Sequence, residues 1–251
     1  MLKTLIFAVA LAAAVAAATE VETSPEAAAE FEKGVTAVNA GKLDDAIAHF
    51  EKSLDYDPKL TVAYEWIAYI KMQQSDTEGA IAEYEKIVQA TPTAEARTTL
   101  GLAYINVGRY DDAITVLKKA TSADPSLGTA WNNLALAYLR KGMLDEAESA
   151  AEKAVALDPD NGQARSNLGS VYIRRGLYDE AWDEFETARE RTPDDPNPYY
   201  GIAEVARYRG EEKLAGDNYL KYLELGGQEQ SKRQRAIDWL WDHGRGAEIP
   251  K

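Results

Sequence analysis

The pattern that decides the fold lies in residues 128–161, GTAWNNLALAYLRKGMLDEAESAAEKAVALDPDN. Its closing proline belongs to a series that returns at intervals of 34, 33, 34 and 34 residues. The series consists of Pro58, Pro92, Pro125, Pro159 and Pro193. A period of this length indicates a stacked array of helix pairs. In such an array each unit packs only on its neighbours, so we expect an extended surface and no closed pocket.

The local signals repeat with the same period. A first helix carries small and aromatic residues at helical spacing and ends at a glycine such as Gly142. Acidic residues open a second helix, and the residue before the proline ends it. Small residues such as Ala147 let the paired helices approach closely, and larger residues such as Tyr138 fill the gaps. Alignment on the prolines gives six units, at 27–60, 61–93, 94–127, 128–161, 162–195 and 196–229.

This pattern resembles the tetratricopeptide repeat family over about residues 27–229, and the third, fourth and fifth units match at nearly every signature position. The resemblance implies an all-α, right-handed superhelical solenoid of antiparallel helix pairs. The first helices of such a solenoid line a concave groove that holds a peptide or a partner helix. The expectation includes no cofactor, no metal and no catalytic residue.

Residues outside the repeats extend this picture. Residues 230–243 are expected to form a capping helix with Ile237, Leu240 and Trp241 on its apolar side, because an open solenoid end exposes core. The alternative is a partner-docking helix with exposed tryptophans. Residues 19–26 are expected to be a flexible lead-in and residues 244–251 a disordered tail.

The resemblance also implies that two rows of first-helix residues face the groove. One row contains Val35, Tyr69, Leu102, Leu136, Ser170 and Glu204. The other, three residues further on, contains Val38, Met72, Ile105, Leu139, Ile173 and Arg207. Exposed apolar rows on a concave face mark a binding surface, so we expect an apolar groove through the first four units. Alternatively, these side chains are partly buried between neighbouring first helices.

Polar groups add to the candidate site. The carboxylate clamp that some family members carry is incomplete, because Asn132 and Asn133 are present but the lysine positions hold other residues. Asn133 and Asn167 occupy equivalent positions and could bond a peptide backbone; Asn132 and Asn167 are included among the candidate groove residues.

Arginines collect on the later units, namely Arg140, Arg174, Arg175, Arg207 and Arg209. They predict an acidic partner segment, since arginine holds a carboxylate with two hydrogen bonds. Pairing with nearby Asp and Glu is the alternative.

Composition excludes several classes of function. With a formal net charge of -14, the chain repels nucleic acid phosphates. It has no cysteine for a disulfide, a thiolate nucleophile or a metal site, and no phosphate-loop, GxGxxG or HExxH sequence. The acid pairs recur at one repeat position, which indicates helix starts and not a hydrolytic pair. We interpret His49 as structural and Asp194, Asp195 and Asn197 as a turn in preference to a calcium site.

The N-terminus has the features of a secretory signal. Lys3 precedes an apolar run over residues 4–15, and three alanines end at Ala18, where we expect cleavage. An uncleaved anchor, which would keep the chain at a membrane, is the alternative. A secreted chain without cysteine suits a bacterial periplasm, because eukaryotic extracellular domains usually carry disulfides.

Three functions are compatible with these features to different degrees. The first is a non-catalytic adaptor of the bacterial cell envelope that binds a peptide or partner helix. The second is a structural subunit of a larger envelope assembly or secretion machine. An enzyme is disfavoured, because no constellation of catalytic residues is present.

Overall fold

The computed structural model describes residues 24–250, which contain thirteen α-helices, one 3-10 helix and no strand. The fold is therefore the all-α helical repeat that the sequence predicts. The signal segment and the lead-in up to residue 23 lie outside the described residues. The helices are α2 (Pro25–Asn39), α3 (Leu43–Tyr56), α4 (Thr61–Gln73), α5 (Thr77–Ala90), α6 (Ala94–Asn106), α7 (Tyr110–Ala123), α8 (Gly128–Lys141), α9 (Leu144–Leu157), α10 (Gly162–Arg175), α11 (Tyr178–Arg191), α12 (Pro196–Tyr208), α13 (Glu212–Glu224), α14 (Gln230–Asp242) and η1 (Gly246–Glu248).

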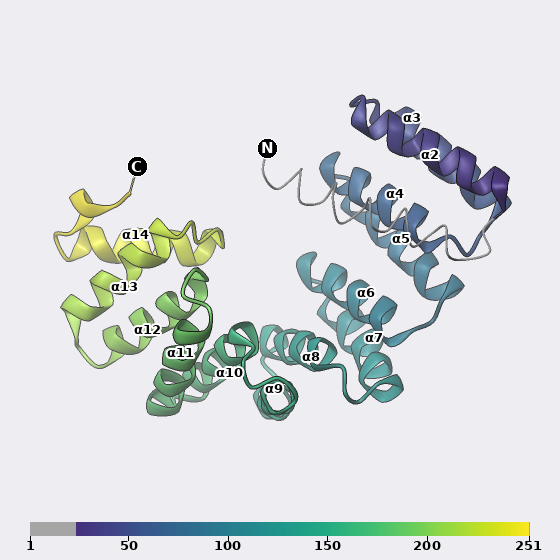
Figure 1. Ribbon diagram of the computed structural model, residues 1–251. Helices are drawn as coiled ribbons and strands as arrows, with labels where there is room; N and C mark the ends of the chain where they lie inside the picture. The colour runs from purple at the N-terminus through teal and green to yellow at the C-terminus, as the bar shows by residue number, and fades with distance from the viewer. Residues whose placement is uncertain (1–23, 251) are drawn as a thin grey trace. The chain divides into compact units, whose positions relative to one another are not determined.

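The chain divides into two compact units. The first is Met1–Arg109 with α2 to α6, and the second is Tyr110–Lys251 with α7 to α14. Within each unit, successive helices pack side by side (Figure 1), and the two helices of a pair, such as α2 with α3 or α8 with α9, share the most extensive contact. The division falls between α6 and α7, inside the expected unit 94–127.

Most first helices end with a glycine in the left-handed region. After α8, Gly142 has a φ of 78° and its N–H donates to the Leu139 carbonyl, a conformation that costs glycine little. After α4 the same position holds Ser75, with a φ of 63°. Among residues 24–250 it is the only non-glycine residue with a positive φ, which costs an L residue about 1–2 kcal/mol. The second repeat therefore carries strain that its neighbours avoid.

The core of every helix pair contains an alanine at one repeat position. Six such alanines, each with 0% of its surface exposed, are Ala46, Ala80, Ala113, Ala147, Ala181 and Ala215. Glycines on the facing helix permit an equally close approach. A Cβ at Gly34 would lie 2.6 Å from the Phe50 ring, and one at Gly169 would lie 2.9 Å from the Phe185 ring. Small residues thus set the helix spacing, and the aromatic rings fill the space that this spacing leaves.

The last helix covers the final repeat. Ala236 and Leu240 of α14 are fully buried in a cluster with Tyr219 and Tyr222 of α13, and Trp239 packs against this cluster. Trp241, expected on the same apolar side, is instead 64% exposed. Its position one residue after Leu240 turns it away from the α13 contact, because neighbouring helical residues point about 100° apart.

The expectation of a disordered tail is wrong for residues 244–250. Gly246–Glu248 form the 3-10 helix η1, and Ile249 packs against the α13–α14 cluster. Arg245 fixes this turn, since its guanidinium donates to Asp217 of α13 at 2.8 Å and to Glu248 at 2.7 Å. A composition rich in polar residues did not reveal these specific contacts.

The alanine constraint gives a direct test of packing. Ala147→Leu should lower the free energy of unfolding by about 1–3 kcal/mol, because the added carbons have no room between α8 and α9. Ala156→Leu, on the exposed face of the same helix, should change it by less than about 0.5 kcal/mol. Urea unfolding followed by circular dichroism measures both. Equal effects would contradict the role assigned to the small residue.

Candidate functional site

In the first compact unit, Met1–Arg109, side chains within both predicted rows differ in exposure. Val35, Val38 and Tyr69 are half-buried and pack against the core cluster around Phe50 and Trp66. Their main contacts are therefore with the protein's own core, which is the alternative that the sequence left open.

Two further residues of these rows in the first compact unit, Met1–Arg109, are exposed. Met72 is 45% exposed and Leu102 is 40% exposed, and both line a cavity of about 110 Å³ between α4, α5 and α6. Ile105, one turn after Leu102, is buried at 7% exposure. The register along a helix therefore does not by itself determine which of these apolar side chains reaches solvent.

In the second unit, the first helices and α14 enclose a larger cavity, which we call the C-terminal groove. It has a volume of about 480 Å³ and is lined by residues of α8, α10, α12 and α14, by Phe185 of α11 and by the connection before α14. The residues predicted from the two rows, the arginine cluster and the candidate asparagines that line it are Leu136, Leu139, Arg140, Asn167, Ser170, Ile173, Arg174 and Glu204. The structure thus brings together eight candidate residues from three successive repeats.

The groove also contains residues that the sequence did not indicate. These are Gln163, Ser166, Phe185, Asn197, Tyr200, Gly201, Glu229, Ser231, Lys232 and Arg235. Several belong to α14 and to the connection before it, which we expected only to cap the last repeat. No local signal could place them here, because their position depends on how α14 packs on α12 and α13.

The arginine cluster separates into two groups. Arg175 donates to Asp145 at 2.6 Å and also pairs with Glu148, and Arg209 donates to Asp179. The contacts with Asp145 and Asp179 each join the end of a first helix to the start of the preceding second helix, thirty residues earlier in the chain. Lys141 with Asp111 continues this series in the second unit, and Gln74 with Asp44 and Arg109 with Glu78 repeat it in the first. We call this series the inter-repeat ladder.

The ladder explains the recurring acid pairs. These carboxylates lie in the first turn of each second helix, where the helix dipole favours negative charge. One member of each pair then holds a side chain of the next repeat. Arg175 and Arg209 are therefore structural, as the alternative interpretation of the arginines stated.

Of the other arginines, Arg140 and Arg174 line the groove, whereas the predicted groove residue Arg207 does not. Arg140 lies 3.4 Å from the Glu229 carboxylate, and Arg207 donates to Glu204 at 3.1 Å. Arg174 lines the groove and, within the described residues, makes no hydrogen bond or ion pair. Four cationic residues, Arg140, Arg174, Lys232 and Arg235, therefore line the groove against two carboxylates, Glu204 and Glu229. This surface carries an excess of positive charge in a chain whose net charge is -14.

A buried carboxylate fixes one wall of the groove. Glu204 of α12 is 8% exposed and accepts a hydrogen bond from the Tyr219 hydroxyl, and Arg207 and Arg235 lie against its other oxygen. Burial raises the pKa of Tyr219, and the Glu204 charge raises it further. The hydroxyl therefore stays protonated and keeps donating. These contacts compensate the burial of the Glu204 charge.

The two candidate asparagines, Asn132 and Asn167, bond each other. The Asn167 amide nitrogen donates to the Asn132 oxygen at 2.8 Å. Asn132 is buried, whereas Asn167 is half-buried and lines the groove. A side-chain amide has two donor hydrogens and an acceptor oxygen, so Asn167 keeps capacity for a peptide backbone group.

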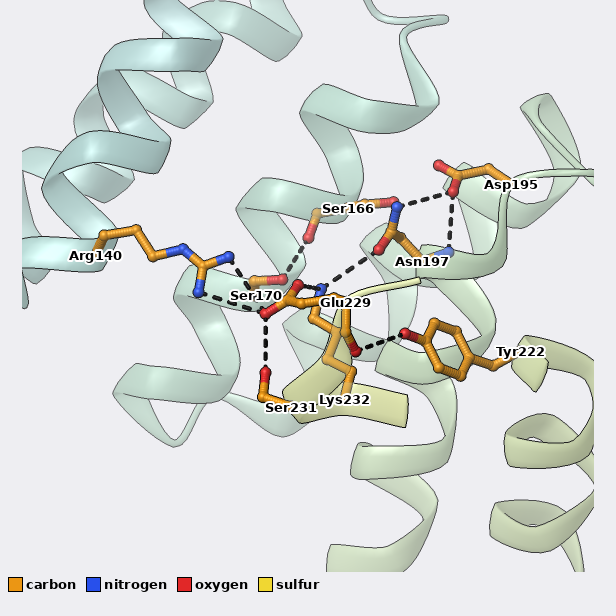
Figure 2. A network of polar contacts seen from close by, with 9 residues as sticks. All are labelled: Arg140, Ser166, Ser170, Asp195, Asn197, Tyr222, Glu229, Ser231 and Lys232. Atoms are coloured by element: carbon orange, nitrogen blue, oxygen red, sulfur yellow. Dashed lines mark hydrogen bonds and ion pairs between the residues drawn. The ribbon is translucent and has the colours of Figure 1, made fainter. Parts of the chain in front are cut away.

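A second polar cluster lies opposite Arg140 (Figure 2). The Glu229 carboxylate accepts from Lys232 of α14 at 2.8 Å and from the Ser231 hydroxyl at 3.3 Å. Lys232 also donates to the Asn197 side chain at 3.3 Å, and the N–H of Asn197 donates to Asp195 at 2.9 Å. Asp195 thus caps α12, in agreement with the interpretation of this segment as a turn.

Residues that we interpreted as structural, and not catalytic, contact other side chains of the protein. His49 contacts Glu30 at 2.8 Å, where Lys33 and Lys52 also donate. Hydrogen bonds from these two lysines and from His49 lower the pKa of Glu30 to about 2. In residues 24–250, no three His, Cys, Asp or Glu side chains are placed to hold a metal ion. No helix in that range is long and apolar enough for a membrane span.

Comparison with known proteins identifies relatives. The family model described as the C-terminal domain of cilia and flagella-associated protein 70 matches residues 3–237. The DnaJ homolog subfamily C member 3 of Gallus gallus is 26% identical over 97 residues, which cover 39% of this chain and 19% of the relative. The human tetratricopeptide repeat protein 6 is 28% identical over 93 residues, which cover 37% of this chain and 18% of the relative. The chain thus spans under a fifth of the length of these curated relatives.

Solved structures are similar over more of the chain. The crystal structure of MamA shares 29% identity with a TM-score of 0.55, covering 64% of this chain and 94% of that protein. PilW, described as a type IV pilus biogenesis factor, has a TM-score of 0.67 at 17% identity and covers 85% of this chain and 99% of that protein. The second likeness shows the fold alone.

Substitution of the adjacent residues Arg174 and Arg175 tests whether the first belongs to the groove and the second to the inter-repeat ladder. Arg175→Glu should lower the free energy of unfolding by about 1 kcal/mol, because it places a third carboxylate beside Asp145 and Glu148. Arg174→Glu should change it by less than about 0.5 kcal/mol. Urea unfolding at low ionic strength compares the two. The division fails if Arg174→Glu destabilises the protein as much as Arg175→Glu does.

Proposed function

The chain belongs to the tetratricopeptide repeat family of the cilia and flagella-associated protein 70 C-terminal domain, and from this premise we propose that it is a non-catalytic scaffold whose C-terminal groove binds a partner protein. Members of this repeat family generally bind other proteins or peptides and do not catalyse reactions. Because the chain spans only part of its curated relatives, their activities are not transferred to it.

The observation that carries the proposal is the positive charge of the groove. Chain-wide negative charge repels an acidic ligand at long range, and only a local excess of cations reverses the sign. Arg140 and Arg174 come from equivalent positions of successive repeats, so they present two guanidinium groups along one line. The partner that suits this surface is an acidic peptide segment, since arginine forms paired hydrogen bonds with carboxylates.

The remaining lining complements such a segment. Leu136 and Ile173 are half-buried and offer apolar contact beside the arginines. Asn167 can bond the backbone of an extended peptide through the amide hydrogen and oxygen that its bond to Asn132 does not use. In this arrangement the apolar floor supplies affinity, and the cations select the sequence that binds.

The proposed location is a bacterial cell envelope. It is supported by the sequence of residues 1–18, with Lys3, the apolar run and the alanines before Thr19, and by the lack of cysteine in the whole chain. N-terminal sequencing of the protein from a periplasmic fraction should then give Thr19 as the first residue. An intact Met1 in a membrane fraction would favour the uncleaved anchor.

Site-specific crosslinking in intact cells tests where partners bind. A photoreactive amino acid at Leu136 or Ile173 should crosslink to a partner, whereas one at Ala156, on the exposed face of α9, should not. Recovery of a short segment of a single protein supports an adaptor. Crosslinks spread over several subunits of one complex would favour the structural role in an assembly.

Charge reversal tests the groove itself. Arg140→Glu combined with Arg174→Glu should weaken partner capture about tenfold or more, because two cations that face the ligand become carboxylates. Lys119→Glu with Lys153→Glu makes the same change in net charge on exposed second helices and should have little effect. Helix content by circular dichroism should stay native in both. Equal capture by the two double variants would refute the groove as the binding surface.

A further inference from the structure

The geometry points to a carboxylate-binding subsite in the C-terminal groove, built by Arg140, Ser231 and Lys232, that the protein's own Glu229 occupies until a partner carboxylate replaces it. This inference rests on the proposed function, because the ligand is an acidic residue of the partner. It adds an internal competitor for that ligand.

Glu229 binds the groove as a ligand would. It reaches Arg140 across 89 residues of sequence, with the guanidinium nitrogens 3.4 and 3.5 Å from one carboxylate oxygen. Lys232 lies 2.8 Å from the other oxygen (Figure 2). Burial tends to raise the pKa of Glu229, but Lys232 and Arg140 outweigh burial and hold the pKa below its usual value. The carboxylate is therefore ionised at neutral pH.

The Glu229 carboxylate does not cap the helix that follows it. Glu229 is the N-terminal capping residue of α14, but its side chain makes no capping hydrogen bond to the helix. The backbone carbonyl of Glu229 accepts a long 3.5 Å bond from Tyr222, which does not involve the side chain. Rotation of the side chain alone can empty the subsite, so the backbone need not move.

The subsite persists when Glu229 leaves. Lys232 keeps its bond to Asn197, and its ammonium lies 5.5 Å from the centre of the Tyr200 ring. Asn197 is in turn fixed by two 2.9 Å hydrogen bonds to Asp195. Arg140 stands 44% exposed, so its guanidinium is accessible to a ligand. A second carboxylate would meet cations that are already in position.

The long contact indicates that Arg140 holds Glu229 loosely, whereas Lys232 lies at an ordinary 2.8 Å. Good charge-assisted hydrogen bonds are about 2.7–2.9 Å long, and exposed ion pairs contribute about 0.2–1 kcal/mol. While Glu229 competes, the apparent affinity for a partner equals the intrinsic affinity multiplied by the fraction of time that the subsite is empty. Removing the internal carboxylate should therefore tighten binding by a modest factor.

The test uses the full chain and a fluorescein-labelled, acetylated tetraglutamate amide as the probe, with affinity measured by fluorescence anisotropy at low ionic strength. Glu229→Gln should bind this peptide about three- to tenfold more tightly than the natural chain, because the competing charge is gone. Glu224→Gln removes an equal charge from α13, outside the groove, and should change the affinity less than about twofold. Arg140→Met in the Glu229→Gln background should abolish the gain.

The other possible results distinguish failure of the internal competitor from failure of the proposed groove. The inference is overturned if Glu229→Gln binds no better than Glu224→Gln, or if it shows no binding at millimolar peptide. If Arg140→Glu with Arg174→Glu still weakens binding, only the internal competitor is refuted and the groove stands. If no groove variant alters binding, the proposed function fails as well. Native circular dichroism spectra exclude misfolding as the cause.

Discussion

The structure depends on one packing constraint, the close approach of two helices across an alanine. The six alanines of this position are all fully buried, so no larger side chain separates the helices of a pair. This spacing fixes where the next first helix lies, and repetition lines up equivalent residues of α8, α10 and α12 along the C-terminal groove. A packing rule of the core thereby determines the geometry of the candidate binding surface.

Charge then distinguishes arginines that are adjacent in sequence. Arg175 reaches back to the preceding repeat and Arg174 faces the groove, although the two residues are adjacent in the chain. The ladder uses carboxylates that already stabilise helix starts, so the same acids serve two roles. In the groove, by contrast, four cationic side chains face only two carboxylates, Glu204 and Glu229. The proposal that the partner is acidic rests on that local imbalance.

The sequence predicted most of the fold, because its signals are local. Proline, glycine and alanine act on the backbone or on one helix contact, and each recurs where the helices end or meet. The ladder was missed because Asp145 and Arg175 are thirty residues apart, although the same interval separates Asp111 from Lys141. The role of Glu229 was beyond prediction, since it depends on the packing of α14 at a distance of 89 residues.

The most direct measurement of the central claim is a crystal structure of the full chain with the tetraglutamate peptide bound. Our account predicts a peptide carboxylate within hydrogen-bond distance of Arg140 and Lys232, with the Glu229 side chain rotated away from both. A peptide bound elsewhere, with Glu229 still between these two cations, would contradict the account.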